Sequence, residues 1–147
     1  MGNCKDKAKE LFMQGYNCAQ AVAGGFCEEV GLDTDTAIKI AASFGGGMGG
    51  MREVCGALTG AFVILGVKYG YLSPTDAGAK ANHYKLISNV GEKFKEKWES
   101  ILCRDLMKKL LDEKDAILGG KPEEYTKRPC LIIVEDVADI LEEILSE

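Results

Sequence analysis

Apolar residues recur along the chain at intervals of three and four, and almost nowhere in strict alternation with polar ones. Intervals of three and four are typical of one face of an α-helix, whereas alternation would indicate a half-buried strand. The pattern therefore predicts an all-α fold. We expect a compact helical bundle of about five to six helices that forms a single domain over residues 1–147, because this length is typical of one domain.

Start and stop signals divide the pattern into segments. The predicted helices are, in chain order, 5–30, 35–44, 51–69, a helix opened by Ser73-Pro74, 101–113, and one opened by Pro129. Gly-Tyr-Asn at 15–17 can break the first of them in two. Ser before Pro predicts a helix start because the hydroxyl caps free amides and Pro suits the first helical position. Ser100 is the predicted cap of the helix at 101–113. Residues 115–129 are expected to form a loop.

The most informative feature of the composition is its cysteines. Six occur in 147 residues: Cys4, Cys18, Cys27, Cys55, Cys103 and Cys130. This share is about 4%, well below the roughly 8–10% of small disulfide scaffolds. The sequence begins without the apolar stretch of a signal peptide. We therefore expect a reducing, cytoplasmic setting, in which cysteines serve as ligands, redox thiols or core residues.

Four of the cysteines share two features. Each falls in the first turn of a predicted helix and on its apolar stripe: Cys18, Cys55, Cys103 and Cys130. Free backbone N–H groups and the helix dipole favour negative charge at that end, and thiolate is the form that binds metals and attacks disulfides. The alternative for each is a small core residue. Cys27 falls near the C-terminal end of the first helix and Cys4 on a fraying end, so the predicted site leaves both out.

The four cysteines are far apart in the sequence, and no two form a CxxC pair. A thioredoxin-type dithiol and a zinc knuckle both depend on that short spacing. Here the thiols would have to converge from four helices, so their site can form only in the folded protein. Four thiolates are the usual ligands of an iron–sulfur cluster, and tetrahedral zinc accepts the same four.

Other chemical groups are sparse. His83 is the only histidine, which excludes multi-histidine metal sites; we expect it to be partly buried, with a proton relay or thiol partner as the alternative. Gly45, Gly47 and Gly50 match GxGxxG, but they follow a predicted helix instead of a strand, which disfavours nucleotide binding. We expect these glycines to bring backbone amides close to the start of the Cys55 helix.

Charge and hydropathy limit the partners. The net charge is −5 and the basic residues are not clustered, so we expect no nucleic acid. The most apolar run, 56–67, has twelve residues, fewer than the roughly 20 of a membrane span, so we expect no membrane. Gly56 and Gly60 permit close helix packing, either within the core or across a homodimer. Arg52 can add positive charge near the glycines, the alternative being a solvated surface side chain.

Several of these segments together resemble one family. FGGGMGGMREVCGALTG at 44–60, NCAQAV around Cys18, ILCRDL around Cys103 and a last cysteine at Cys130 resemble the C_GCAxxG_C_C family of redox-active proteins. Its CGAxxG motif is present at 55–60. The resemblance implies a small helical protein of redox function, related to the cluster-bearing part of split-Soret cytochromes. It also implies that Gly56 and the same four cysteines bind the cofactor. The sequence has no CxxCH, so covalent haem is not expected.

Three hypotheses follow. The first is an electron-transfer or redox-sensing protein whose four cysteines hold an iron–sulfur cluster, with the 2Fe–2S type favoured, and which exchanges electrons with an unknown redox partner protein. The second is a metal-free thiol–disulfide protein with a low-pKa Cys55 as its attacking thiol. The third is a non-catalytic helical module whose cysteines bind structural zinc or simply pack.

Overall fold

The computed structural model describes residues 3–147, and within them the regular structure is helical, as predicted. The elements are α1 (Cys4–Met13), α2 (Cys18–Phe26), η1 (Cys27–Val30), α3 (Thr34–Ala41), η2 (Ala42–Phe44), α4 (Gly45–Met48), α5 (Gly56–Tyr69), α6 (Ala77–Trp98), α7 (Cys103–Asp112), α8 (Lys114–Leu118), α9 (Glu123–Lys127) and α10 (Leu131–Leu145). α4 contains non-helical angles at Gly46 and Gly47. Without it, the described residues form nine α-helices, more than the expected five to six.

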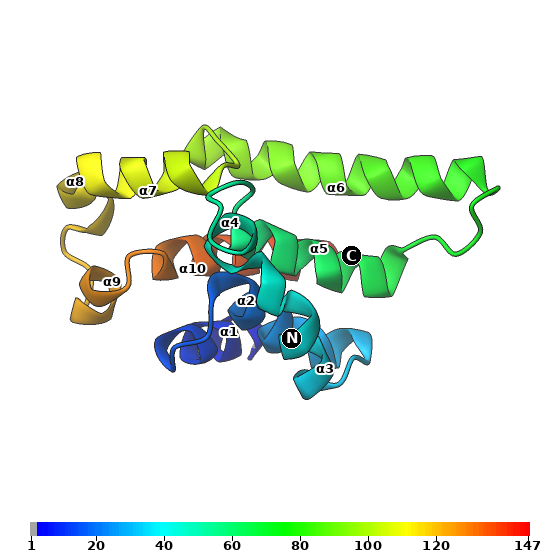
Figure 1. The fold of residues 1–147 in the computed structure, drawn as a ribbon, viewed down its shortest axis with the longest axis horizontal. Coiled ribbons are helices and arrows are strands. Elements are labelled where there is room, and N and C mark those ends of the chain that lie inside the picture. Colours follow the sequence, from blue (N-terminus) through cyan, green and yellow to red (C-terminus); the bar gives the residue numbers. More distant parts are fainter. Residues whose placement is uncertain (1–2) are drawn as a thin grey trace.

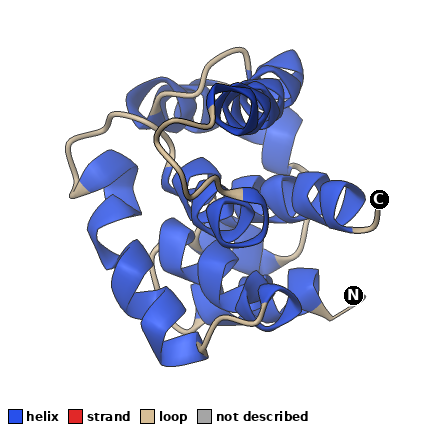
Figure 2. Cartoon of the chain, turned by 90° about the vertical axis from the view of Figure 1, so that its right-hand side faces the viewer, coloured by secondary structure: helices blue, strands red, loops and turns tan. Residues whose placement is uncertain are grey.

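The helices lie in three tiers (Figure 1). The long helix α6 and the following α7 run along one side, α5 and α10 occupy the middle, and α1, α2 and α3 lie on the opposite side. The view at right angles shows the helices joined by short loops and turns, with no strand in the described residues (Figure 2). α4 contacts α2, α5 and α7, so the glycine run lies where the three tiers meet.

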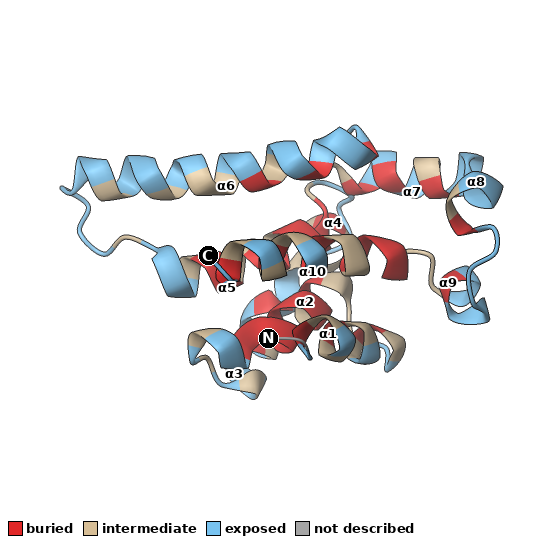
Figure 3. Ribbon diagram, turned by 180° about the vertical axis from the view of Figure 1, so that it is seen from behind, coloured by how far each residue is buried: buried red, intermediate tan, exposed pale blue. Residues whose placement is uncertain are grey.

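The core is built around α2, which packs on α1, α3, α5 and α10. All but two of its residues are buried, and most are Ala or Gly. A Cβ added at Gly25 would lie 2.7 Å from the Cβ of Ala8 in α1, and one at Gly60 would lie 2.6 Å from the carbonyl oxygen of Ala19. These glycines therefore let helices approach backbone to backbone within the core. Figure 3 shows buried residues concentrated in α2, α5 and α10, whereas most of α6 is exposed.

Two of the predicted helix caps are wrong. Asp76, and not Ser73, caps α6, because its side chain accepts a hydrogen bond from the Ala79 N–H at 3.0 Å. The Ser73 hydroxyl instead accepts from the Thr75 N–H at 3.3 Å, in the preceding turn. Ser100 likewise accepts from the Leu102 N–H at 3.0 Å, one turn before α7. Short polar side chains stabilise turns and helix starts by the same hydrogen bonds, so the sequence pattern does not separate the two.

The remaining boundary differences have clear causes. The first predicted helix is divided into α1, α2 and η1, with Gly15 at φ 109° in the first break. α5 begins at Gly56 and not at residue 51, because Val54 pairs with Leu102 in an isolated antiparallel bridge. The predicted loop at 115–129 instead contains α9 and most of α8. Buried Tyr125 holds this segment against the core.

Candidate functional site: four cysteines at helix starts

The four selected cysteines all stand at helix starts in the structure. Cys18 and Cys103 are the first residues of α2 and α7, and Cys55 and Cys130 immediately precede α5 and α10. A capping box begins α2: the Asn17 side chain accepts from the Gln20 N–H at 2.8 Å, and the Gln20 side chain accepts from the Asn17 N–H at 3.1 Å. We call these four residues the cysteine site.

The bridge between Val54 and Leu102 aligns two members of the site. The Cys55 N–H donates to the Ile101 carbonyl at 2.8 Å, and the Cys103 N–H donates to the Glu53 carbonyl at 2.6 Å. The bridge therefore brings the backbone of Cys55 and that of Cys103 close together, although the two residues are far apart in the sequence.

Electrostatic interactions link all four thiols. Burial is the main cause that raises the pKa of Cys18, and the charge of Cys103 raises it further. Burial and then Cys18 raise the pKa of Cys55, which also interacts with Cys130. Burial raises the pKa of Cys130 to about 11, with additional effects from Cys18 and Cys103. The structure therefore brings the four predicted residues into one electrostatic cluster, although residues 3–147 contain no group of three or more His, Cys, Asp or Glu arranged to hold a metal ion.

Helix-start amides act on these sulfurs in the predicted direction, but burial outweighs them. Backbone N–H groups of Ala57 and Leu58 lower the pKa of Cys55, yet its thiol is only 5% exposed and its pKa is raised. The expectation of a low-pKa Cys55 is therefore wrong. A thiol so buried stays protonated, because the apolar surroundings disfavour its charged form.

Residues 45–50, which we call the glycine loop, approach the sulfurs through the backbone. Gly46, Gly47, Gly49, Gly50 and also Met48 have φ between 63° and 79°, a left-handed turn that glycine adopts without strain. The Gly46 amide hydrogen-bonds to Cys18 and lowers its pKa. The expected approach of backbone amides is thus confirmed.

Glycine is also required by contacts with the cysteines themselves. A Cβ at Gly47 would lie 2.6 Å from the Cβ of Cys103, and one at Gly56 would lie 2.5 Å from the Sγ of Cys18. Both distances are far shorter than real Cβ contacts. The loop and the start of α5 therefore form a surface without side chains against two of the thiols. Four thiolates are in chemical type the ligands of an iron–sulfur cluster or of zinc.

One side of the cysteine site is less covered. Cys18 and Cys130 are partly exposed, whereas Cys55 and Cys103 are buried. The Cys130 thiol lies 3.7 Å from the sulfur of Met107 in α7. An Arg52 Nη1 lies 3.5 Å from the Cys103 sulfur.

Cys27 and Cys4 stand apart from the cysteine site. Cys27 caps the C-terminal end of α2, and its thiol donates to the Gly24 carbonyl at 3.3 Å. Cys4 is not on a fraying end as expected: it is the first residue of α1 and is 8% exposed. Its pKa is raised to about 11, mainly by burial, and Glu142 near the end of α10 contributes. The fifteen residues of α10, about 22 Å of helix, separate that end from Cys130.

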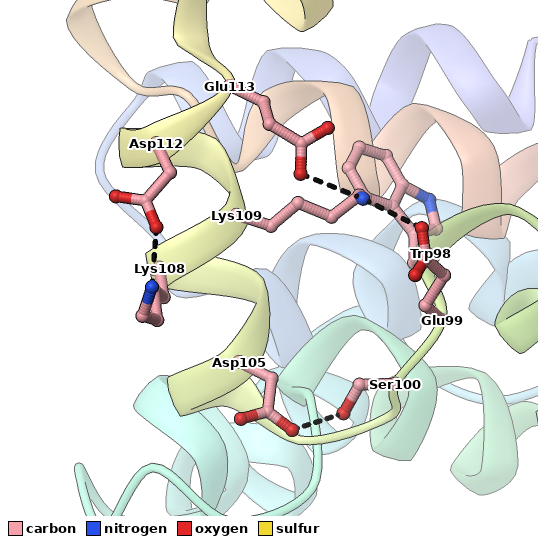
Figure 4. Close-up of a pocket in the computed structure, with 8 residues that line it drawn as sticks. All are labelled: Trp98, Glu99, Ser100, Asp105, Lys108, Lys109, Asp112 and Glu113. Atoms are coloured by element: carbon pink, nitrogen blue, oxygen red, sulfur yellow. Dashed lines mark hydrogen bonds and ion pairs between the residues drawn. The ribbon is translucent and has the colours of Figure 1, made fainter.

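Two of the surface pockets outside the cysteine site lie against α6. One, of about 320 Å³, lies where α6 meets α7 and is lined by charged groups (Figure 4). Lys109 pairs there with Glu99 and Glu113, each at 3.1 Å, and Lys108 pairs with Asp112 at 2.6 Å. The two lysines thus pair with three of the four carboxylates, and the fourth, Asp105, accepts a hydrogen bond from the Ser100 hydroxyl at 2.7 Å.

The other pocket lies between α5 and α6. It has a volume of about 500 Å³ and is lined mainly by apolar side chains, among them Phe62 and Ile87, together with His83. His83 is partly buried, as predicted, and its ring packs edge-on against Tyr71. Its Nδ1 atom is buried without a hydrogen-bond partner in the part of the chain that the structure describes.

Comparison with known proteins agrees with the arrangement of the cysteines. The family model described as Putative redox-active protein (C_GCAxxG_C_C) matches residues 16–144. The chain belongs to this family. The span shared with the C_GCAxxG_C_C family includes the whole cysteine site and the glycine loop, and it excludes Cys4. Searches of curated proteins and of solved structures found no significant match. None of the helices within residues 3–147 is both long and apolar enough to cross a membrane.

Proposed function

We propose that this C_GCAxxG_C_C protein holds an iron–sulfur cluster, of the 2Fe–2S type, on Cys18, Cys55, Cys103 and Cys130. The observation that carries the proposal is the convergence of four buried or half-buried thiols whose charged forms disfavour one another. Such thiols lose their protons readily only when a cation neutralises them, because a coordinating metal deprotonates a thiol outright. When bound, the cluster would accept and release electrons for a redox partner protein.

The same burial argues against a metal-free dithiol. Exchange requires a thiolate as the attacking group, and burial holds Cys55 in its protonated form. Zinc would satisfy four thiolates equally well, but it has no redox chemistry, whereas the family is described as redox-active.

The chain's own residues then have defined tasks. The helix starts direct backbone N–H groups at the sulfurs, and Gly46 donates one to Cys18. Hydrogen bonds to ligand sulfur raise the reduction potential by stabilising the added negative charge. Apolar packing around Cys55 keeps water away from the most buried ligand.

Anaerobic purification followed by visible absorption, iron and sulfide analysis tests the proposal. We expect a brown protein with equal amounts of iron and acid-labile sulfide. Stoichiometric zinc, or a colourless protein whose cysteines form a disulfide of defined potential, would overturn it.

Serine substitutions test the assignment of the ligands. Replacing any member of the cysteine site should abolish or strongly reduce iron binding. Cys27→Ser is the control: Cys27 is more deeply buried than any member of the cysteine site, and a serine hydroxyl can replace the thiol as the donor to the Gly24 carbonyl. If Cys27→Ser lost its iron while Cys103→Ser kept it, the choice of ligands would be wrong.

A further inference from the structure

Arg52 places an uncompensated positive charge beside the cysteine site. Its Nη1 lies 3.5 Å from the Cys103 sulfur, and its charge also reaches Cys130 and Cys18. Among residues 3–147, no carboxylate lies within ion-pairing distance of Arg52. The contrast with Arg104 is direct, because that arginine pairs with Glu53 at 3.3 Å.

The backbone holds Arg52 at this position. Its φ of 60° is unusual for a residue with a side chain, and hydrogen bonds fix it there. The Arg52 N–H donates to the Gly46 carbonyl at 3.1 Å, and its own carbonyl accepts from Nη1 of Arg104 at 3.2 Å. Arg52 therefore extends from the same loop that supplies an amide to Cys18.

Its guanidinium is exposed to solvent and in contact with sulfur at the same time. A guanidinium carries five N–H donors in a rigid plane, and the contact with Cys103 uses only one nitrogen. The other donors remain available to an incoming group. Because Arg52 also interacts with the partly exposed Cys18 and Cys130, a molecule approaching these sulfurs meets the guanidinium.

We propose that Arg52 selects anionic reactants for the cysteine site: electron donors, electron acceptors or thiol reagents that carry a carboxylate or a similar acid group close to the reacting atom. The inference rests on the proposed redox function and specifies its substrate class. The protein carries a net charge of −5, which repels such molecules at a distance, and a local cation reverses that effect where the reaction occurs.

Two aromatic disulfides of different charge test this on the metal-free, reduced protein. Dithiobis(nitrobenzoate) is a dianion and dithiodipyridine is neutral. In both, a cysteine thiolate attacks one sulfur, the probe's S–S bond breaks, and one aromatic thiolate leaves, so no other oxidant is needed. Mass mapping of the labelled peptides identifies the sulfurs that react. The ratio of the rate with the anionic probe to the rate with the neutral probe is the quantity compared, because a change in thiolate concentration affects both rates equally.

We expect Arg52→Gln to lower this ratio about three- to fourfold, which is the size that Coulomb's law gives for one pair of unit charges at about 5–6 Å in water-like surroundings. Arg52→Lys should restore most of it, and salt should reduce the wild-type ratio. Arg104→Gln, the matched control, should leave it within about twofold. An unchanged ratio in Arg52→Gln would overturn the inference. That outcome is independent of iron content, so it is distinct from a failure of the proposed cluster.

Discussion

Alanine at Gly56 is the sharpest test of how the cysteine site is packed. The added Cβ would lie 2.5 Å from the Cys18 sulfur and 2.9 Å from the carbonyl oxygen of Phe44. The carbonyl belongs to the backbone at the end of η2, so it cannot move aside alone, and the end of η2 as well as Cys18 at the start of α2 would have to shift. Overpacking of this kind typically costs about 1–3 kcal/mol. At a typical urea dependence of about 2 kcal/mol per molar, the unfolding midpoint should fall by roughly 0.5–1.5 M.

The chain offers a control in the same helix. Gly66 also lies in α5, and a Cβ there would meet nothing within 4 Å. Gly66→Ala should therefore stabilise the protein by about 0.5–1 kcal/mol, because alanine restricts the unfolded chain more than glycine does. Urea unfolding of the metal-free, reduced protein measures both changes, and iron content after anaerobic purification measures the effect on the site. Gly56→Ala as stable and as rich in iron as the wild type would refute the close contact with Cys18.

Two further predictions concern pH and helix capping. Burial raises the pKa of Cys130 from about 9 to about 11. The unfolded chain therefore releases the thiol proton at a lower pH than the folded chain does. The metal-free protein should keep this part of its stability below about pH 9 and lose it as the pH rises towards 11. Urea unfolding across this range should show a shallower decline in Cys130→Ser, and an identical decline would contradict the assignment. Asn17→Ala and Asp33→Ala should each cost about 1 kcal/mol, because both remove a cap: Asp33 caps α3 by accepting from the Thr36 N–H, as Asn17 caps α2. Only Asn17→Ala should reduce iron content, because Asn17 directly precedes Cys18. Equal iron contents in the two variants would show that the cap does not position this thiol.

The fold class and the position of four cysteines at helix starts could be predicted because both depend on local signals. Apolar spacing indicates helices, and capping residues such as Asn17 indicate their starts to within a few positions. The direction in which the pKa of Cys55 is shifted could not be predicted in this way. It depends on how deeply the start of α5 is buried, and that depth is set by α2 and by the bridge to Leu102, which lies far along the sequence.

Other features were missed for a similar reason. Cys4 is buried because α1 packs along α10, a contact between the two ends of the chain that no local pattern indicates. The sequence is compatible with two positions for the Arg52 side chain, one near the glycines and one in solvent at the surface. Only the three-dimensional arrangement shows that it is in contact with sulfur and that no carboxylate of residues 3–147 pairs with it.

The convergence of four helix starts also has a consequence for folding. Successive members of the cysteine site are 37, 48 and 27 residues apart, from positions 18, 55, 103 and 130. Any group bound by all four would close three long loops of the chain, and loop closure of this kind removes freedom mainly from the unfolded state, as a disulfide does. Loading of the site would then act as a cross-link between distant segments. Resistance to unfolding would therefore rise and fall with occupancy of the site.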